Sequence, residues 1–350
     1  MQAWQIKDSW GLENLELTEI PERPPGPGEV QVAFQSASLN YRDLLVVKGH
    51  YNPKFPRPLI PCSDGFGRIV AVGQGVPQDL LNLSAITLFC PPWQGGSPRA
   101  ETLRHTLGGP LPGVLQEYRN FRPEELLILP EPSALTPAEW ATLPCAGVTA
   151  WNCLMEDAKL KAGQTVLLIG TGGVSLFGLQ IARMAGAKVF LLSSSNEKRV
   201  RALDMGAEAV EDYREVPEWS RWVLEKTGGL GVDVVLETGG AGTLGQSLKS
   251  VKVGGHISLL GVLSGSKESI NILPLVMKAV TVRGVVVGNK QHSQALHDAY
   301  LQNMVRPVVH ETYSWNHVPE AFRALSSGHQ FGKITIEFPD RDLKTQESGE

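Results

Sequence analysis

A glycine-containing turn has the clearest chemical potential in this sequence. It reads Gly170-x-Gly172-x-x-Ser175 and lies between the apolar run TVLLI and the helical pattern SLFGLQIARMAGA. The first glycine permits a tight turn, and the second lets backbone N–H groups approach a pyrophosphate at the positive end of the helix. Ser175 replaces the usual third glycine and is small enough for close helix–sheet packing. The turn predicts a dinucleotide site, and the alternative is a turn that binds nothing.

The next strand, KVFLL, ends about 20 residues after the turn, where a side chain that contacts the ribose belongs. An NAD-selective site carries Asp or Glu at this place. This chain instead has Ser193, Ser194 and Ser195, followed by Lys198. Hydroxyl groups and a cation suit a 2′-phosphate, and the missing carboxylate removes a repulsion against it. We therefore predict NADPH in preference to NADH, unless Lys198 is only a solvated charge at a helix start.

The composition argues against several other classes of protein. The 350 residues are 42% hydrophobic and 19% charged, with a net charge of −4 and no basic run, so we expect a small-molecule substrate and no nucleic acid. No apolar stretch is long enough for a membrane span, and the N-terminus does not resemble a secretory signal. The four cysteines are scattered, which is typical of reduced thiols in a cytoplasmic protein.

The elements around the turn predict an α/β fold. Strand and helix patterns alternate from residue 165 to 288, which indicates a parallel sheet with helices on both faces. Residues 1 to about 40 are β-like, with Val30, Val32 and Phe34 alternating with more polar positions. Residues 38–51 resemble a short helix or turn. Residues 93–113 are rich in Gly and Pro and predict a long loop, for which a lid over a site is one candidate role.

Six segments together resemble a known family. They are NYRDLLVVKGHY, IPCSDGFGRIVAVG, LPCAGVTAW, the glycine turn, GVDVVLETGG and FGKITIEF. Their order and spacing are similar to those of the medium-chain dehydrogenase/reductase superfamily, and more closely to its zinc-free, quinone-oxidoreductase-like branch. Some of them also resemble chains labelled zinc-type alcohol dehydrogenases.

The resemblance implies two domains and a dimer. A GroES-like β-barrel domain would comprise residues 1–135 with 290–350, and a Rossmann domain with a doubly wound parallel sheet would comprise residues 136–289. The family often forms homodimers through the last strand of the Rossmann sheet, which here would be VTVRGVVVG. The simpler alternative is that this segment is only a buried strand.

The resemblance also bears on zinc. Zinc-using members supply Cys, His and Cys, with a Glu after the His, whereas this chain has Asn40, Ser63 and Cys145 at the ligand positions and Asp64 at the Glu position. A catalytic zinc needs three protein ligands, so we expect none here. An irregular site made by Cys62, Asp64 and Cys145 is the alternative.

Three candidate catalytic residues follow from the matched segments. Asn40 would donate a hydrogen bond to the substrate carbonyl or to the nicotinamide ribose, Tyr51 would donate a hydrogen bond or proton, and Asp64 would support them. The alternatives are that Asn40 only caps a helix and that Tyr51 only packs. Without a Lewis acid, hydride addition to an activated C=C or a quinone needs less help than reduction of a simple carbonyl, because the charge spreads onto an oxygen that one donor can stabilise. Leu45 stands where quinone reductases often carry a second tyrosine, which weakens the inference of quinone specificity.

We thus predict an NADPH-dependent, zinc-independent reductase of an enone or quinone. The alternatives are an NADP(H)-dependent alcohol dehydrogenase or carbonyl reductase, and a noncatalytic NADPH-binding protein. The residues expected to contact the cofactor are Asn40, Thr149, Gly170, Gly172, Gly173, Val174, Ser193, Ser194, Ser195, Lys198, Tyr213, Gly261, Val262 and Leu263.

Overall fold

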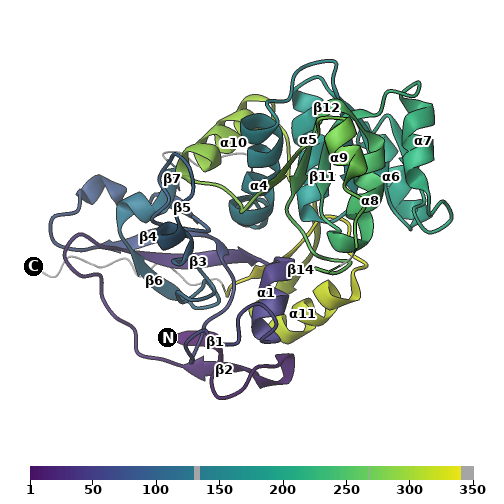
Figure 1. Ribbon diagram of the computed structural model, residues 1–350. Helices are drawn as coiled ribbons and strands as arrows, with labels where there is room; N and C mark the ends of the chain where they lie inside the picture. The colour runs from purple at the N-terminus through teal and green to yellow at the C-terminus, as the bar shows by residue number, and fades with distance from the viewer. Residues whose placement is uncertain (130–134, 268, 340–350) are drawn as a thin grey trace, which may run out of the picture. The chain divides into compact units, whose positions relative to one another are not determined.

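A computed structural model describes residues 1–129, 135–267 and 269–339 (Figure 1). The chain divides into two compact units. The β-rich unit contains Met1–Cys145, Asn289–Leu301 and the residues from Val309 onward, and the parallel-sheet unit contains Ala146–Gly288 and Gln302–Val308. The chain therefore leaves the β-rich unit, forms the other unit and returns.

The parallel-sheet unit is built on a six-stranded sheet with the order β10-β9-β8-β11-β12-β13. Every neighbouring pair is parallel, as the alternation of strands and helices predicts. The strands are β8 Thr165–Ile169, β9 Lys188–Leu192, β10 Ala209–Glu211, β11 Val232–Glu237, β12 Val251–Leu259 and β13 Thr281–Gly284. The last strand is shorter than the predicted segment VTVRGVVVG, because Val280 and residues 285–288 are not part of it.

Helices cover both faces of this sheet. The strand order steps one way from β8 to β10 and the other way from β11 to β13, so right-handed crossovers place the helices of the two halves on opposite faces. In agreement, α4 packs on α5, whereas α8 packs on both α7 and α9. The helices are α4 Val148–Trp151, α5 Gly173–Met184, α6 Asn196–Asp204, α7 Trp219–Lys226, α8 Ala241–Ser250 and α9 Leu273–Met277. The prediction of a doubly wound sheet is confirmed.

The β-rich unit contains a seven-stranded sheet and a separate two-stranded sheet. The larger sheet has the order β14-β15-β3-β4-β5-β7, with β6 also paired to β3, and the smaller one pairs β1 with β2. The strands are β1 Gln2–Ile6, β2 Leu15–Glu19, β3 Val30–Ser38, β4 Asp64–Val72, β5 Ser84–Thr87, β6 Tyr118–Phe121, β7 Leu126–Leu129, β14 Val309–Ser314 and β15 Lys333–Glu337. The helices are α1 Tyr41–Val47, α2 Ala100–Leu103, α3 Pro137–Ala141, α10 Lys290–Gln302 and α11 Val318–Ser327.

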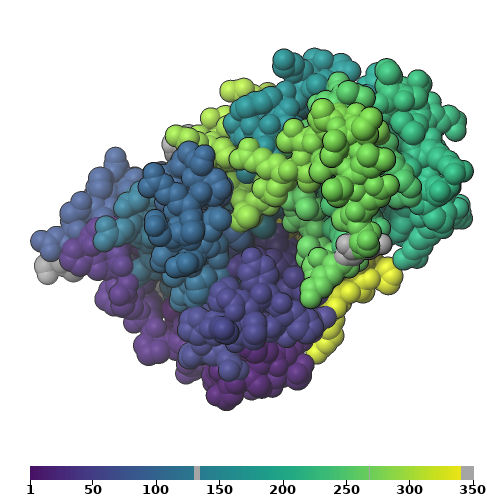
Figure 2. Space-filling view, viewed as in Figure 1, coloured from purple at the N-terminus to yellow at the C-terminus, as the bar shows by residue number. Residues whose placement is uncertain are grey.

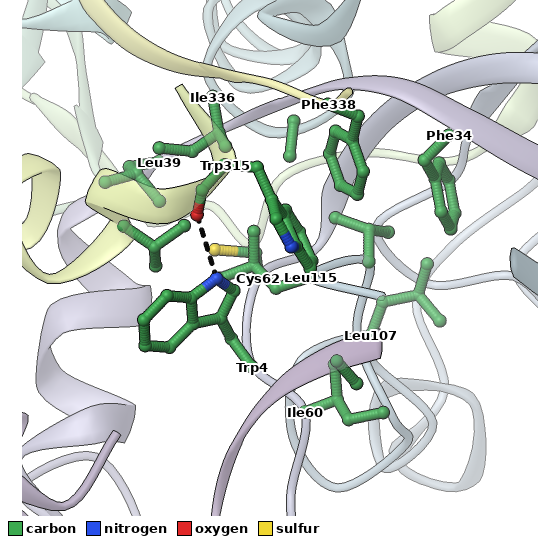
Figure 3. Packing of buried hydrophobic residues seen from close by; sticks show 14 of the residues in the cluster. Trp4, Phe34, Leu39, Ile60, Cys62, Leu107, Leu115, Trp315, Ile336 and Phe338 are labelled. Carbon is green, nitrogen blue, oxygen red and sulfur yellow. Dashed lines mark hydrogen bonds between the residues drawn. The ribbon is translucent and has the colours of Figure 1, made fainter. Parts of the chain in front are cut away.

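The core of the β-rich unit joins segments from both ends of the chain. Trp4 Nε1 donates to the carbonyl oxygen of Trp315 at 3.0 Å, and the rings of Trp315 and Phe338 lie 4.5 Å apart (Figure 3). Strand β15 pairs with β3, so the C-terminal segment completes the sheet begun by the N-terminal one. This return of the chain brings Lys333, at the start of β15, next to the N-terminus of α1.

In the described part of the chain, no helix combines the length and the apolar character needed to cross a membrane.

Candidate active site

The glycine turn leaves open space at the N-terminus of α5. Gly170 has a φ of +79°, the left-handed region in which glycine is favoured, and Gly172 is the N-cap residue of α5. A Cβ atom added at either residue would meet no heavy atom within 4 Å. The first N–H groups of a helix have no partner within the helix, and its dipole favours an anion there. The turn therefore has the shape and the donors that a pyrophosphate needs.

Ser175, at the position of the usual third glycine, contributes to the structure of the turn. It is buried, and its Oγ donates to the carbonyl oxygen of Ile169 at 2.9 Å. Thr238 Oγ1 donates to the same carbonyl oxygen at 2.8 Å. The two hydroxyl groups connect the end of β8 to the start of α5 and to the end of β11. The serine thus adds a hydrogen bond that glycine could not make.

The predicted cofactor contacts of this unit gather at one edge of the sheet. The carboxyl ends of parallel strands share an edge, so the residues after β8, β9 and β12 lie along it, and the strand order reverses between β8 and β11. Gly261 packs closely, because a Cβ there would lie 2.0 Å from the carbonyl oxygen of Thr238. Val262 and Leu263 are 52% and 55% exposed. Open α/β sheets bind ligands at such a reversal point.

The three serines after β9 differ in their surroundings. Ser193 is buried, and its carbonyl oxygen accepts from Arg199 Nη1 at 2.8 Å. Ser195 caps α6, with its Oγ accepting from the backbone N–H of Lys198 at 3.4 Å. Ser194 is half-buried, and its Oγ accepts from the Tyr213 hydroxyl at 3.3 Å. Of the three, Ser194 is the best placed for a ligand.

The cations near this strand end also differ. Arg199 pairs with Asp212 at 2.5 Å, and both side chains are largely buried. Its guanidinium group is thus engaged within the protein. Lys198 is half-buried, and burial lowers the pKa of its ammonium group. The contact of Lys198 with a 2′-phosphate stays a prediction.

A buried polar cluster, formed by Asn40, Asp43, Asp64 and Lys333, occupies the β-rich unit at the N-terminus of α1. Asn40 is the residue before α1, and its backbone N–H donates to Asp43 Oδ2 at 2.8 Å. Lys333 Nζ donates to the carbonyl oxygen of Leu39 at 2.7 Å and to Asn40 Oδ1. The short helix or turn expected within residues 38–51 is the helix α1, Tyr41–Val47. The Asn40 side chain also contacts a lysine that comes from the other end of the chain.

Asp64 is held at the centre of this cluster. Its Oδ1 accepts from the Ser63 hydroxyl at 2.6 Å, and its Oδ2 accepts from the Cys145 backbone N–H at 3.2 Å. Lys333 Nζ lies 3.8 Å from the same Oδ2. Burial raises the pKa of the Asp64 carboxyl above its ordinary value, while Lys333 and the Asn40 amide lower it. The Ser63 and Cys145 positions, predicted as former ligand positions, thus hold this carboxylate.

Asp43 is the second buried carboxyl of the cluster. Burial raises its pKa to about 6, and the positive charge of Arg42 opposes this rise. The neighbouring Asp64 adds to it, because a second negative charge disfavours ionisation. The Asp43 carboxyl therefore loses its proton near pH 6 rather than near pH 4.

Tyr51 lies outside the buried cluster. Its side chain is 49% exposed, and its ring contacts Phe55 at 6.1 Å between centroids. The Arg42 guanidinium carbon lies 4.8 Å from the centre of the Tyr51 ring, and the same guanidinium donates to the carbonyl oxygen of Leu107 at 3.0 Å. Arg42 thus connects Tyr51 to the loop that precedes β6.

That loop braces the cluster, at least over its second half. Leu107 is fully buried, and the Val114 N–H donates to the carbonyl oxygen of Cys62 at 3.0 Å. Cβ atoms at Gly108 or Gly113 would lie within 2.7 and 2.1 Å of Cys62 backbone atoms. Cys62 itself has a φ of +69°. The lid considered for residues 93–113 is therefore wrong for 107–113, which pack against the backbone preceding Asp64.

The residues at the zinc-ligand positions do not fit a zinc ion. Of the three positions named above, only Cys145 carries a thiol, and a lysine ammonium group, which cannot ligate a metal, lies against Asp64. Within residues 1–129, 135–267 and 269–339, no group of three or more His, Cys, Asp or Glu residues is arranged to hold a metal ion.

Two functional candidates were missed from the sequence. Lys333 carries a signal in retrospect, because a lysine beside the alternating apolar strand ITIEF is unusual unless its charge is paired. Glu237 is fully buried and accepts from the N–H groups of Gly239 and Gly240 at 2.8 and 3.0 Å. It thereby orders the loop after β11, at the edge that carries the predicted cofactor contacts. Thr149, another predicted contact, lies buried in α4 of the same unit.

Comparison with known proteins extends these observations. A family model for a zinc-binding dehydrogenase matches residues 173–302, and one for an alcohol dehydrogenase GroES-like domain matches residues 26–131. A zinc-type alcohol dehydrogenase-like protein of Schizosaccharomyces pombe is 35% identical over 324 residues, which cover 91% of this chain and 93% of the relative. Acryloyl-coenzyme A reductase of Sulfurisphaera tokodaii is 26% identical over 335 residues, which cover 93% of this chain and 96% of the relative.

A crystal structure from Sinorhizobium meliloti 1021 is similar to this fold with a TM-score of 0.89 and 39% identity, covering 96% of this chain and 98% of that one. The GroES-like and Rossmann architecture expected from the sequence is thus confirmed. The chain therefore belongs to the medium-chain dehydrogenase/reductase superfamily, whose members include NAD(P)H-dependent oxidoreductases.

Proposed function

We propose that this oxidoreductase uses NADPH, without zinc, to reduce an activated C=C or a quinone. One observation carries the proposal: Lys333 holds the Oδ1 atom of Asn40, the residue at which the resemblance implies a zinc ligand in zinc-using relatives. Its Nδ2 atom is buried and makes no hydrogen bond of ordinary geometry to a described residue, although it lies close enough to the Asp64 carboxyl to lower the pKa of that group. An unused buried donor is costly, and a substrate oxygen would satisfy it.

The chemistry needs only a few groups from the chain. Bound NADPH supplies the hydride, which adds to the carbon β to a carbonyl while the C=C electron pair moves onto the carbonyl oxygen. Asn40 Nδ2 donates to that oxygen, and one such donor contributes about 10²–10³-fold to kcat in other enzymes. Tyr51, which is exposed, can then pass a proton to the α carbon, directly or through water.

The preference for NADPH rests on the end of β9. No carboxylate stands among Ser193, Ser194 and Ser195, and the Tyr213 hydroxyl reaches Ser194 at 3.3 Å. Together with Lys198, these groups offer hydroxyl donors and a positive charge to a 2′-phosphate. The carboxylate that usually accepts from a 2′-hydroxyl is missing from these three residues.

A relative that bears the name of an acryloyl-coenzyme A reductase favours C=C reduction. The name of the Schizosaccharomyces pombe relative favours the alternative, an NADP(H)-dependent alcohol dehydrogenase. The two proposals differ in the need for metal, since alkoxide formation from a simple carbonyl relies on a Lewis acid more strongly.

The test is NADPH consumption by chelator-treated protein, with an enone, a quinone and an aldehyde measured side by side. We expect turnover of the enone or quinone that survives chelation. Activity confined to the aldehyde, lost on chelation and restored by Zn²⁺, would refute the proposal in favour of the alcohol dehydrogenase. NADPH binding without turnover of any of the three acceptors would favour a noncatalytic role.

We also propose a homodimer formed through the edge of the parallel sheet, in a cytoplasmic protein that binds neither nucleic acid nor membrane. Strand β13 is at the end of the strand order, and exposed apolar side chains lie close to it in sequence or in the sheet. Val253, Val276 and Met277 are 71%, 68% and 73% exposed, and α9, which carries the last two, is on the face seen in Figure 2. Met277→Asp should shift the protein toward the monomer in analytical ultracentrifugation. An unchanged sedimentation coefficient would contradict this interface.

A further inference from the structure

Lys333 is a buried cation of the polar cluster, and its ammonium group contacts two cluster residues and the backbone of Leu39. Lys333 is 4% exposed and is the first residue of β15. The ammonium group donates to the carbonyl oxygen of Leu39 and to Asn40 Oδ1, and lies 3.8 Å from Asp64 Oδ2. A lysine is almost never buried in this way unless its charge is paired, and the pair here is with Asp64.

The other nearby cation points elsewhere. Arg42 donates through Nη1 to the carbonyl oxygen of Leu107 at 3.0 Å and through Nη2 to Thr106 Oγ1 at 2.9 Å. It also lies over the rings of Tyr51 and Phe89. Arg42 is therefore committed to the loop and to Tyr51, while Lys333 is committed to Asn40 and Asp64.

The chemistry of Lys333 decides the orientation of the Asn40 amide. An ammonium group has only donors, so it must face the oxygen of a carboxamide and not its NH₂ group. With Oδ1 bound to Lys333, Nδ2 is directed away from the ammonium group. A flipped amide would place two sets of donors against each other in a buried site, which is strongly unfavourable. Asp64 in turn holds the ammonium group through their opposite charges.

We propose that Lys333 is a positioning residue for the reaction. It orients the Asn40 amide so that Nδ2 can donate to the substrate oxygen. This role rests on the proposed function, because it takes Asn40 as the donor. It goes beyond that function by assigning the orientation of the donor amide to Lys333, the first residue of β15.

The competing explanation is that Lys333 only stabilises the fold by binding the Leu39 carbonyl oxygen and Asp64. A matched control is available in Lys278, whose ammonium group donates to the carbonyl oxygens of Leu248, Lys249 and Val251. Lys278→Met removes a lysine of that structural kind from the other unit. Lys278→Met should change the stability of the protein and leave kcat within about twofold. A loss of stability by itself does not remove a contact that the enzyme makes with the transition state.

The test is a double-mutant cycle on kcat at saturating NADPH, with Lys333→Met, Asn40→Ala and the double variant. We expect each single variant to lose about 10²-fold in kcat, the scale of one lost oxyanion donor. Because the lysine acts through the amide, the double variant should be within about threefold of the slower single variant. NADPH affinity should stay unchanged in Lys333→Met, because Lys333 is not among the expected cofactor contacts. Multiplying losses, or full kcat in Lys333→Met, would overturn the proposal.

Two further measurements keep the test decisive. If Lys333→Met does not fold, the cycle is run in an Asp64→Asn background, where neither charge of the pair remains and burial of the site costs less. If the wild-type protein reduces no acceptor, the proposed function fails, and Lys333 is then tested by nuclear magnetic resonance. The Asn40 side-chain NH₂ signals, assigned by their absence in Asn40→Ala, should shift and broaden in Lys333→Met but not in Lys278→Met. Unchanged signals would overturn the assignment.

Discussion

Gly172→Val should remove cofactor binding without unfolding the parallel-sheet unit. Gly172 has a φ of −75° and a ψ of 178°, which a valine adopts without strain. A Cβ atom there meets no heavy atom of the protein within 4 Å. The cost to the fold is therefore limited to the poorer N-cap, about 1 kcal/mol. The side chain instead fills the space in which a pyrophosphate would lie.

The loss of affinity can be worked out from the donors at this turn. A pyrophosphate against the first turn of α5 would accept about two charge-assisted hydrogen bonds, each worth roughly 1.5–3 kcal/mol. Losing both costs about 3–6 kcal/mol, which is a rise in Kd of roughly 10²–10⁴-fold. Because NADPH and NADH share the pyrophosphate, both cofactors should be affected alike.

The assay is titration of NADPH and of NADH, followed by the fluorescence of the bound nicotinamide, with thermal unfolding measured on the same samples. Gly245→Val is the matched control, since Gly245 is exposed on α8 and a Cβ there also meets no heavy atom within 4 Å. The control should keep wild-type affinity. A folded Gly172→Val protein that binds NADPH as tightly as the wild type would refute the assignment of the turn.

Three other variants test the remaining assignments. Lys198→Glu should weaken NADPH binding by about 1–3 kcal/mol, the scale of a charge-assisted hydrogen bond, and spare NADH. Lys249→Glu, an equal charge change at an exposed residue of α8, should alter neither affinity. Equal losses for both cofactors would count against the 2′-phosphate contact. Tyr51→Phe keeps the ring over Arg42 and removes only the hydroxyl, so kcat should fall by about 10²-fold or more if Tyr51 is the proton donor, and full turnover would exclude that role. Asp43→Asn should flatten the pH dependence of stability: burial raises the pKa of Asp43 from 3.8 to about 6, so the folded protein holds the proton more tightly and the free energy of unfolding falls by about 3 kcal/mol as the pH rises from about 4 to 6. The free energy of unfolding is measured by denaturant titration at several pH values in that range. An equal change of this free energy with pH in the variant and the wild type would contradict the prediction.

The sequence by itself determined the parallel sheet and its glycine turn, because these depend on local patterns. The runs TVLLI and KVFLL are five residues long and flank a helix of the α5 pattern, which favours buried strands. The carboxyl ends of parallel neighbouring strands lie at one edge of the sheet. That edge brings the residues after β8, β9 and β12 together without any knowledge of distant contacts. The sequence also showed the three serines after β9 and the missing carboxylate. It did not show that the serines differ in their surroundings, because the ion pair of Arg199 and Asp212 that covers the Ser193 carbonyl oxygen is a tertiary contact.

Only the tertiary structure decided the polar cluster. Asn40 and Lys333 are 293 residues apart, and their contact exists because β15 pairs with β3 after the chain has completed a whole second unit. No local propensity encodes such a pairing, whose entropy cost is met by the packing of Trp315 and Phe338 in the core of the β-rich unit. The sequence showed that a zinc-ligand set was lacking, and the fold showed that a buried lysine lies there instead. A charge can be placed in an apolar interior only where its partner already is, and that partner is known only once the chain has folded.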